Sequence, residues 1–288
     1  MKLITTVCND RYLPGLLVFL HSFKKHHSEW QYPFKVYHRD DLSERSKDQL
    51  KVVYPDLTFE YIEDPKFYGK DAHYMCLLPF KEFNYEQVIF LDCDMLCLGP
   101  INSLFKVKAP FAACLDYELK WPKQTIIKYV PFLLRYWRYY NTGVFSVRKP
   151  LLNPTIYQML IDAIDSNVAG RTTKQKKLWD QDIINECFRF KNTSILPYTF
   201  NARKNLFKRY FNPIEAGVKI IHYTGGAKPW YVPGCGFLPL EGKYARYQPL
   251  HILWHEERKD FIQTHGFDPM QDFIAHYQQQ AAHAPQDA

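Results

Sequence analysis

The sequence lacks any hydrophobic run long enough to cross a bilayer, and its start lacks the features of a leader. The longest apolar run, residues 16–20, is far shorter than the roughly 20 residues that a spanning helix needs. Residues 1–7 enter a strand pattern directly, without the apolar stretch and small-residue cleavage site of a signal peptide. These absences predict a protein that is neither exported nor membrane-spanning.

Paired cysteines are also lacking. The seven cysteines include no CxxC pair, and several lie within apolar, strand-like runs where a small buried hydrophobic residue is expected. A zinc site needs paired spacings, and Cys93 with Cys97 provides only a weak one. We therefore expect reduced thiols in a cytoplasmic protein, rather than a disulfide framework.

Phosphate-binding glycine loops and basic clusters are missing too. No P-loop occurs, and Asn9 and Asp10, after the first predicted strand, are not the basic, glycine-rich loop of a nucleotidyltransferase. The net charge of +7 suits an anionic small molecule, an anionic membrane surface or nucleic acid, and equally suits plain solubility. Because the basic residues are scattered and no recognition motif is present, we expect no nucleic-acid partner.

The sequence does contain a regular alternation of strand and helix patterns. Strands are expected at residues 3–8, 34–38, 58–62, 88–91, 111–115, 143–147 and 218–222. Helices are expected at residues 13–26, 43–53 (with Ser43 as N-cap), 71–80, 154–167, 180–188 and within 251–277. This order predicts an α/β fold with a parallel sheet covered on both faces. Without a Gly/Ser-rich linker, we expect one catalytic domain, 1–250, then a helical extension with a frayed tail, 251–288.

The first chemical motif is a pair of carboxylates, Asp92 and Asp94, directly after the apolar strand 88–91. Residues i and i+2 of a strand point to the same side, so the two side chains could share one hard divalent cation. Ligand sites of open parallel sheets lie at the carboxyl ends of the strands. Taken alone, the pair is as consistent with two solvated, loop-capping aspartates.

A second strand-end motif spans residues 218–230. His222, a ligand-type residue, ends the strand; Gly225 and Gly226 let a backbone approach a ligand closely, and Lys228 offers a cation to phosphate oxygens. The alternatives are a core histidine and a tight glycine turn.

Two further polar groups precede apolar stretches. Asp180, Gln181 and Asp182 open a helical pattern, and Asn141 comes just before a strand. Carboxylates and amides suit sugar hydroxyls or a reacting sugar carbon. The alternatives are an N-cap for Asp180 and a turn residue for Asn141.

In this order the motifs resemble glycosyltransferase family 8, especially bacterial lipooligosaccharide galactosyltransferases and, more distantly, glycogenin. The family's ordered pattern is a strand-end DxD, N-[SAT]-G, DQD-x-x-N and H-x-x-G-x-x-K-P-W. The sequence matches all four, at residues 92–94, 141–143, 180–185 and 222–230. Each piece is short, but the ordered set is specific.

The resemblance implies a GT-A fold with a Rossmann-like, mixed and mostly parallel sheet. It implies a retaining, UDP-sugar-dependent hexosyltransferase, with UDP-glucose or UDP-galactose favoured and a saccharide, glycoconjugate or lipid-linked saccharide as acceptor. The implied metal is Mn²⁺, with Mg²⁺ as the alternative, held by Asp92, Asp94 and His222. A non-catalytic nucleotide-sugar or carbohydrate-binding protein with a decayed site is the competing interpretation.

The resemblance also assigns residues to the donor. The uridine pocket is implied at Thr6, Cys8, Asn9 and Tyr12, the diphosphate contacts at Gly225 and Lys228, the sugar hydroxyls at Asn141 and Asp180, and the rest of the donor site at Cys93 and Asp182. Gln181, Asp180 and Asp116 are the catalytic candidates. A neutral amide such as Gln181 is a poor nucleophile, and Asp180, Asp182 and Asp116 are better ones by charge, although the sequence does not place them at the reacting carbon. We favour attack of the acceptor on the face from which the phosphate leaves.

Two segments depart from the family pattern. The family often carries Arg or Lys in the helix before the DxD strand, whereas residues 74–77 contain no cation, so Lys70 or His73 could substitute. Residues 121–140 interleave basic and aromatic side chains, which suits a membrane interface or a carbohydrate surface and equally an ordinary helix with a buried aromatic face. We expect this segment to serve the acceptor, with possible peripheral contact at the inner face of a membrane.

Overall fold

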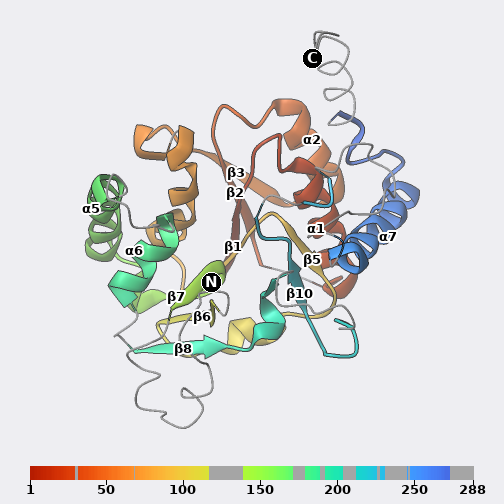
Figure 1. Cartoon of the computed structure of the whole chain (residues 1–288). Coiled ribbons are helices and arrows are strands. Elements are labelled where there is room, and N and C mark those ends of the chain that lie inside the picture. The colour runs from red at the N-terminus through yellow and green to blue at the C-terminus, as the bar shows by residue number, and fades with distance from the viewer. Residues whose placement is uncertain are drawn as a thin grey trace.

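One seven-stranded sheet forms the centre of the molecule (Figure 1). The structure, a computed structural model, describes residues 1–29, 32–67, 69–116, 139–170, 179–188, 192–203, 212–225, 228–230, 245 and 247–272. The sheet order is β3-β2-β1-β4-β7-β6-β8. Its strands are β1 (Lys2–Val7), β2 (Phe34–His38), β3 (Leu57–Tyr61), β4 (Gln87–Leu91), β6 (Phe111–Leu115), β7 (Tyr140–Arg148) and β8 (Thr193–Leu196).

Strand β7 is reversed. It pairs antiparallel with both of its neighbours, β4 and β6, whereas the other neighbouring pairs of this sheet are parallel. The first residues of β7 therefore lie at the edge where the parallel strands end. There the Asp116 N–H donates to the Tyr139 carbonyl at 2.8 Å, so the end of β6 and the start of β7 are held together. The expected mixed, mostly parallel sheet is confirmed.

Helices cover both faces of the sheet, as the alternating pattern predicts (Figure 1). The longer helices are α1 (Leu13–His26), α2 (Glu44–Val53), α5 (Pro154–Gly170), α6 (Trp179–Phe188) and α7 (Gln248–His265). The 3₁₀ helices are η1 (Pro65–Phe67), η2 (Gly69–Lys81), η3 (Asn102–Lys106), η4 (Lys149–Leu151) and η5 (Tyr198–Phe200). Ser43 caps α2 as predicted, because its side chain accepts a hydrogen bond from the Ser46 N–H at 3.3 Å.

Strand β4 shows why the core has two halves. Ile89 and Leu91 pack with α1 on one face of the sheet, and Val88 and Phe90 pack with η2, α5 and α6 on the other. Successive side chains of a strand point to opposite faces, so a central strand covered on both must be apolar throughout. This burial fixes the strand whose last residue precedes Asp92.

A second, three-stranded sheet lies beside the first. It has the order β5-β10-β9, formed by β5 (Met95–Cys97), β10 (Ile220–His222) and β9 (Ala202–Arg203). Apolar residues of this sheet pack with Val18 of α1 and with Trp230 and Trp254 in a separate cluster. The small sheet therefore connects the turn after β4 to the strand that carries His222.

Several predicted elements differ in detail. The helix expected at residues 71–80 is a longer 3₁₀ helix, and Pro79 within it has no N–H for an α-helical hydrogen bond. The strand expected at 218–222 is shortened to β10, and α7 ends at His265 because the next residue, Gly266, has a φ of 76° that stops a helix. Strands β5, β8 and β9 were not expected. The predicted tail, residues 278–288, lies outside the described residues.

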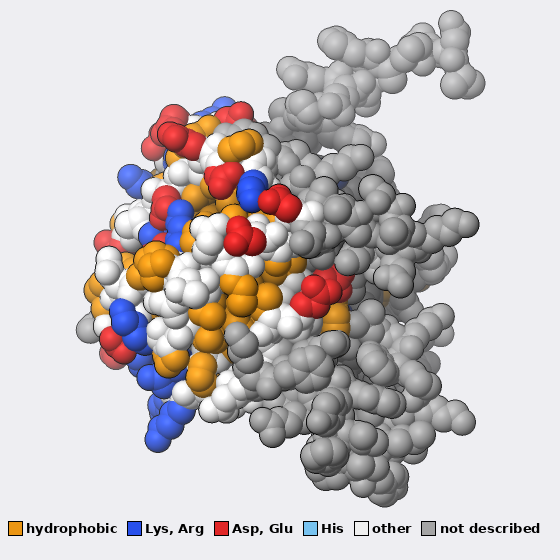
Figure 2. Space-filling model, turned by 90° about the vertical axis from the view of Figure 1, so that its left-hand side faces the viewer, with side chains coloured by type: hydrophobic (Ala, Val, Ile, Leu, Met, Phe, Trp, Pro, Cys, Tyr) orange, Lys and Arg blue, Asp and Glu red, His pale blue; other side chains and the backbone are white. Residues whose placement is uncertain are grey.

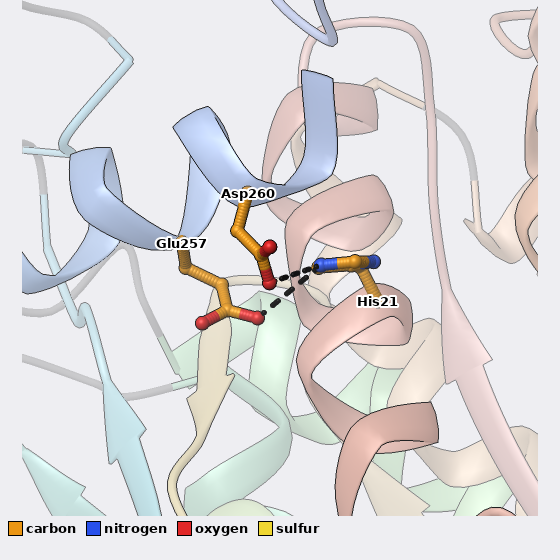
Figure 3. A group of neighbouring side chains, drawn as sticks. All are labelled: His21, Glu257 and Asp260. Atoms are coloured by element: carbon orange, nitrogen blue, oxygen red, sulfur yellow. Dashed lines mark hydrogen bonds and ion pairs between the residues drawn. The ribbon is translucent and has the colours of Figure 1, made fainter. Parts of the chain in front are cut away.

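Charged side chains join α7 to α1 (Figure 3). His21 Nε2 lies 3.1 Å from Asp260 Oδ2 and 3.5 Å from Glu257 Oε1. A metal could use these three groups, but the Lys25 ammonium lies 3.0 Å from Glu257 and 2.8 Å from Asp260 and already supplies a cation. The cluster is therefore best explained as an ion-pair contact that holds α7 in place. The division into a domain at 1–250 and an extension at 251–288 stays a proposal.

The surface beside α5 and α6 mixes both signs of charge. In the coloured part of Figure 2, acidic and basic side chains are interspersed among apolar ones. Among the described helices, none is both long and apolar enough to cross a membrane. The described cysteines, Cys8, Cys76, Cys93, Cys97, Cys114 and Cys187, are all free thiols.

Candidate active site

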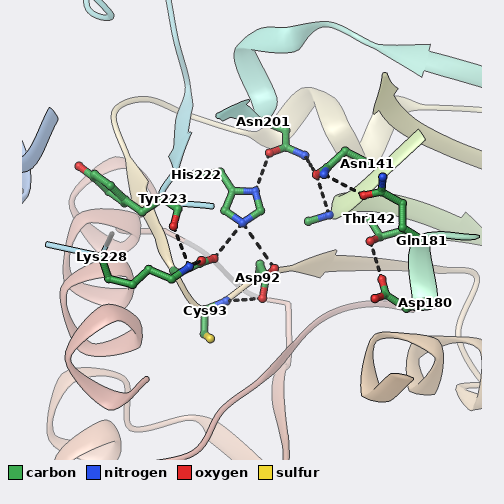
Figure 4. Close-up of polar contacts among 12 residues, drawn as sticks. Asp92, Cys93, Asn141, Thr142, Asp180, Gln181, Asn201, His222, Tyr223 and Lys228 are labelled. Carbon is green, nitrogen blue, oxygen red and sulfur yellow. Dashed lines mark hydrogen bonds and ion pairs between the residues drawn. The ribbon is translucent and has the colours of Figure 1, made fainter. Parts of the chain in front are cut away.

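Asp92 and Asp94 lie in the turn that follows β4 (Figure 4 labels Asp92). The Asp92 N–H donates to the Gly143 carbonyl of β7 at 2.9 Å, and the Cys93 N–H donates to Asp92 Oδ1 at 3.2 Å. The side chain of Asp92 remains 40% exposed, whereas that of Asp94 is 5% exposed. The turn thus presents one open and one buried carboxylate.

His222 meets both carboxylates because β10 pairs with β5. This antiparallel pairing sets His222 opposite Met95, directly after the turn, and the Tyr223 N–H donates to the Asp94 carbonyl at 2.9 Å. Nε2 of His222 lies 2.9 Å from Asp94 Oδ1 and 3.5 Å from Asp92 Oδ2. The three residues predicted as metal ligands are therefore brought together.

Gly143 makes room for the imidazole. A Cβ on this glycine would lie 2.3 Å from Cε1 and 2.5 Å from Nδ1 of His222, distances that real Cβ atoms do not show. The glycine of the N-T-G motif thus has a local physical reason: the ring of His222 rests against the β7 backbone.

Lys228 completes a compact charge cluster. Its ammonium pairs with Asp94 Oδ2 and donates to the Tyr223 carbonyl at 2.7 Å (Figure 4). Burial by itself would raise the pKa of Asp94, but Lys228 and His222 outweigh burial and hold that pKa well below its usual range. Burial lowers the pKa of His222, yet Asp94 and Asp92 outweigh it and raise the pKa to about 9. The buried part of the site is therefore ionic: the Asp94 carboxylate faces the His222 imidazolium and the Lys228 ammonium.

The residues present fit a divalent cation. Two carboxylate oxygens and one imidazole nitrogen lie within 4.8 Å of one another. Asp94 Oδ1 is buried and receives no well-directed hydrogen bond from the described residues, although His222 Nε2 is close. Oxygen ligands with one imidazole suit Mn²⁺ or Mg²⁺ better than a soft metal.

A row of amides and carboxylates continues from this cluster toward α6 (Figure 4). Asn141 Nδ2 donates to Gln181 Oε1 at 3.0 Å, and Gln181 Nε2 donates to Asp116 Oδ2 at 2.8 Å. Asp116 also pairs with Arg203 at 2.7 Å, and both side chains are buried. The predicted residues Asn141, Gln181 and Asp116 are thus linked directly, and the amide of Gln181 is held at both of its ends.

Asp180 faces the same region from within the first described turn of α6. Its Oδ2 accepts from Thr142 Oγ1 at 2.6 Å, and Asp180 is not an N-cap because it is itself a helical residue of α6. Burial raises the pKa of Asp180 to about 6, against the hydrogen bonds from Cys76 and Thr142. Asp182, two residues on, accepts instead from the Tyr139 hydroxyl.

The missing cation of the preceding helix is explained in part. Cys76, not a basic residue, donates to Asp180, and the imidazole of His73 acts to lower the pKa of Asp180 against the effect of burial. The side chain of Lys70 and the residue Gly226 lie outside what the structure describes, as do residues 121–138 of the segment expected to serve the acceptor.

The predicted uridine residues line the end of β1 and the start of α1. The Tyr12 N–H donates to Asn9 Oδ1 at 3.2 Å, and the hydroxyl of Thr6 is buried without a hydrogen-bond partner among the described residues. The Cys93 thiol contacts that of Cys8. The Lys228 ammonium lies 5.5 Å from the Tyr12 ring centre, so this group adjoins the charge cluster. Gly225 follows with a φ of 75°, a conformation that favours glycine.

Sequence reasoning missed Asn201 and Arg203. Both are buried, and β9 sets Arg203 opposite His222. Asn201 lies between His222 and Asn141 (Figure 4). The sequence feature that could have identified them is the one that identified Asp92, a polar residue directly after an apolar one. Strand β9 has only two residues, however, so no alternation of apolar and polar side chains could be recognised there.

Residues 3–232 match the family described as Glycosyl transferase family 8. The chain belongs to this family. The resemblance inferred from the four motifs is therefore confirmed.

Curated relatives of this family 8 chain are distant in sequence. Human glycogenin-2 is 24% identical over 278 residues, which cover 87% of this chain and 49% of that protein. The lipopolysaccharide 1,3-galactosyltransferase of Salmonella typhimurium is 28% identical over 157 residues, which cover 51% of this chain and 44% of that protein. The matches thus span about half the length of these two relatives.

Solved structures share the fold. The galactosyltransferase LgtC, in complex with donor and acceptor sugar analogs, superposes with a TM-score of 0.59 at 19% identity, covering 89% of this chain and 100% of that one. GlyE of Streptococcus pneumoniae TIGR4 gives a TM-score of 0.63 at 19% identity, covering 89% of this chain and 60% of that one. The family 8 chain has the GT-A fold, as expected.

Proposed function

We propose that this family 8 protein is a metal-dependent, retaining hexosyltransferase. Its donor is a UDP-sugar, UDP-glucose or UDP-galactose, and its acceptor is a saccharide, a glycoconjugate or a lipid-linked saccharide. The observation that carries the proposal is the convergence of Asp92, Asp94 and His222 on one point, with Lys228 beside them, at the carboxyl edge of the sheet. Relatives that are named as a lipopolysaccharide 1,3-galactosyltransferase and as glycogenins support the saccharide acceptor.

Three residues would hold the cation. The carboxylates of Asp92 and Asp94 and Nε2 of His222 are the ligands, and bound Mn²⁺ or Mg²⁺ supplies positive charge against the donor diphosphate. Lys228 adds a second positive charge at the diphosphate, with Gly225 leaving the backbone accessible. The hydroxyl of Thr6, which has no hydrogen-bond partner among the described residues, suits a polar atom of the uridine, beside Cys8, Asn9, Tyr12 and Cys93.

The group transfer breaks the bond between the anomeric carbon and the β-phosphate oxygen and forms one to an acceptor hydroxyl oxygen. The electron pair leaves with UDP, and the acceptor proton passes to the departing phosphate oxygen. The carboxylate of Asp116 is engaged by Arg203 and Gln181, which weakens it as a nucleophile. These contacts support same-face attack, with Asn141, Asp180 and Asp182 orienting the sugar and Gln181 near the anomeric carbon.

Metal binding is expected to release a proton and to strengthen as pH rises. The imidazolium of His222 must lose its proton before Nε2 can bind a cation. Because its pKa in the metal-free protein is about 9, the apparent Mn²⁺ affinity should rise about tenfold per pH unit below that value and level off above it. Calorimetry in two buffers of different ionisation enthalpy counts the protons released. An affinity that does not change between about pH 6 and pH 8 would contradict the role of His222.

The same ionisation affects the stability of the metal-free protein. The folded-state pKa of His222 is raised from 6.5 to about 9. Its ion pairs therefore stabilise the fold fully below about pH 6.5, and this contribution is lost as pH rises through about 9.

UDP binding is expected to depend strongly on a divalent metal. Without the cation, the diphosphate would meet the carboxylates of Asp92 and Asp94 and be repelled by them. Titration of UDP into the protein with Mn²⁺, and again with a chelator, measures the difference in affinity. Equal affinities would count against Asp92, Asp94 and His222 as ligands.

A non-catalytic nucleotide-sugar or carbohydrate-binding protein is the competing function. A transferase and a binding protein would both bind UDP, so only turnover of a UDP-sugar distinguishes the two functions. A panel of UDP-sugars, scored for slow hydrolysis with Mn²⁺, identifies both a catalyst and its preferred sugar. Metal-dependent binding of UDP without hydrolysis of any donor would favour the binding protein.

A further inference from the structure

The side chain of Asn201 contacts His222 with one end and Asn141 with the other (Figure 4). It therefore connects the charge cluster to the row of amides that runs through Gln181. Its Oδ1 lies 2.8 Å from His222 Nδ1, and its Nδ2 lies 2.7 Å from Asn141 Oδ1. The side chain is buried, with 2% of the residue exposed. A buried amide that uses both ends has one orientation, and the neighbours determine which one.

That orientation follows from the backbone of β7. The Gly143 N–H donates to Asn141 Oδ1 at 3.1 Å, and a backbone N–H can only donate, so this atom is the acceptor. The end of Asn201 that faces it must then be the donating Nδ2. The opposite end, Oδ1, therefore faces His222 and accepts from a protonated Nδ1.

The hydrogen bonds at the Asp116 end of the row give the same orientation of the amides. Asn141 Nδ2 is left to donate to Gln181 Oε1, and Gln181 Nε2 donates to the Asp116 carboxylate, which can only accept when ionised. Arg203 pairs with that carboxylate. The direction of every hydrogen bond from Gly143 to Asp116 is thus fixed from two independent ends.

We propose that Asn201 is a positioning residue, which holds His222 as the tautomer with its proton on Nδ1 and its free Nε2 aimed between Asp92 and Asp94. This inference rests on the proposed function, because it concerns how the histidine is prepared for a cation. Partners behind a ligating histidine fix its tautomer and ring orientation, and their loss typically weakens metal binding about 10–100-fold. Through Asn141, the same amide also holds the carbonyl end of Gln181 in place.

The test compares Asn201→Ala with Asn201→Asp. Alanine removes the acceptor for Nδ1–H, so Mn²⁺ affinity, followed by electron paramagnetic resonance of free Mn²⁺, should fall about 10–100-fold. Aspartate keeps an acceptor toward His222 but loses the donor to Asn141, so it should restore most of the affinity while costing stability. If Asn201 had only a structural role, the Mn²⁺ affinity of each variant would instead fall in proportion to its loss of thermal stability.

A spectroscopic readout reports on the tautomer itself. In ¹⁵N-histidine spectra of the Mg²⁺-loaded protein, assigned with His222→Gln, wild type should show His222 protonated on Nδ1, and Asn201→Ala should lose that signal. Asn185→Ala is the matched control, since Asn185 is equally buried and bonds Tyr140 and the Gln181 backbone rather than His222. It should lower stability and leave the His222 signal and Mn²⁺ affinity unchanged.

The outcomes separate this inference from the proposed function. Wild type that binds Mn²⁺ while Asn201→Ala binds it equally well, with the Nδ1 proton retained, overturns the inference alone. Wild type that binds neither Mn²⁺ nor UDP overturns the proposed function. If Asn201→Ala does not fold, the folded Asn201→Asp decides: an affinity reduced as far as that expected for alanine overturns the inference.

Discussion

Replacing Asp92 by asparagine is expected to reduce metal-stimulated UDP-sugar turnover by at least about 100-fold while the fold survives. The amide removes a charged ligand from the cation site but keeps an oxygen for the Cys93 N–H that Asp92 Oδ1 accepts. The Asp92 side chain is 40% exposed and lies 3.5 Å from its basic neighbour, His222. Donor hydrolysis with and without Mn²⁺, beside a thermal unfolding curve, measures both effects.

The companion variant Asp94→Asn tests the same site less cleanly. It should also lose turnover, but it leaves the buried ammonium of Lys228 without its carboxylate. Breaking a buried ion pair from one side costs about 3–5 kcal/mol, so this variant should be visibly destabilised. Asp165→Asn, at a 70% exposed side chain, is the control that should change neither quantity. Near-normal turnover in both active-site variants would remove the DxD assignment.

Replacing Gly143 by alanine is expected to abolish high-affinity metal binding by displacing His222. The added Cβ would lie 2.3 Å from the ring, so the imidazole must move away from Asp92 and Asp94. Overpacking of this kind costs about 1–3 kcal/mol, and the loss of one of three ligands should weaken Mn²⁺ binding by at least about 100-fold. The expected effect does not come from backbone strain, because the described glycines with positive φ do not include Gly143.

Gly99→Ala is the matched control for this substitution. Its Cβ would approach the flexible Lys219 side chain at 3.0 Å, and that chain can move aside. We expect near-native Mn²⁺ affinity for Gly99→Ala, measured by the same resonance titration. If Gly143→Ala also bound Mn²⁺ as wild type does, His222 could not be the third ligand in the position described.

The parts of the fold that followed from sequence are those where one physical requirement dominates. Strand β4 must be apolar on both faces, and α1 is buried along most of its length, so both produce long, unmistakable patterns. Strands β5 and β9 have three and two residues, and their pairing depends on distant segments. No local period could reveal them.

The candidate site shows the same division. The motifs identified residues at the ends of clearly apolar runs, such as Asp92 after β4, and the geometry brings Asp92, Asp94 and His222 together. Asn201 and Arg203 escaped because their importance comes from what they contact, not from a local pattern. For Asp116, the sequence offered a nucleophile, whereas the contact with Arg203 makes it a better anchor for Gln181.

The reversed strand β7 has a consequence for how such a protein can diversify. The end of β6 and the start of β7 lie at the same edge of the sheet, and Asp116 and Tyr139 are hydrogen-bonded there at 2.8 Å. The segment that joins these two residues is therefore attached beside the candidate active site at both of its ends. Exchanging that stretch of chain costs the core only the slowly growing entropy of loop closure. If the proposed function is correct, acceptor specificity could therefore change through this one segment while Asp92, Asp94 and His222 stay in place.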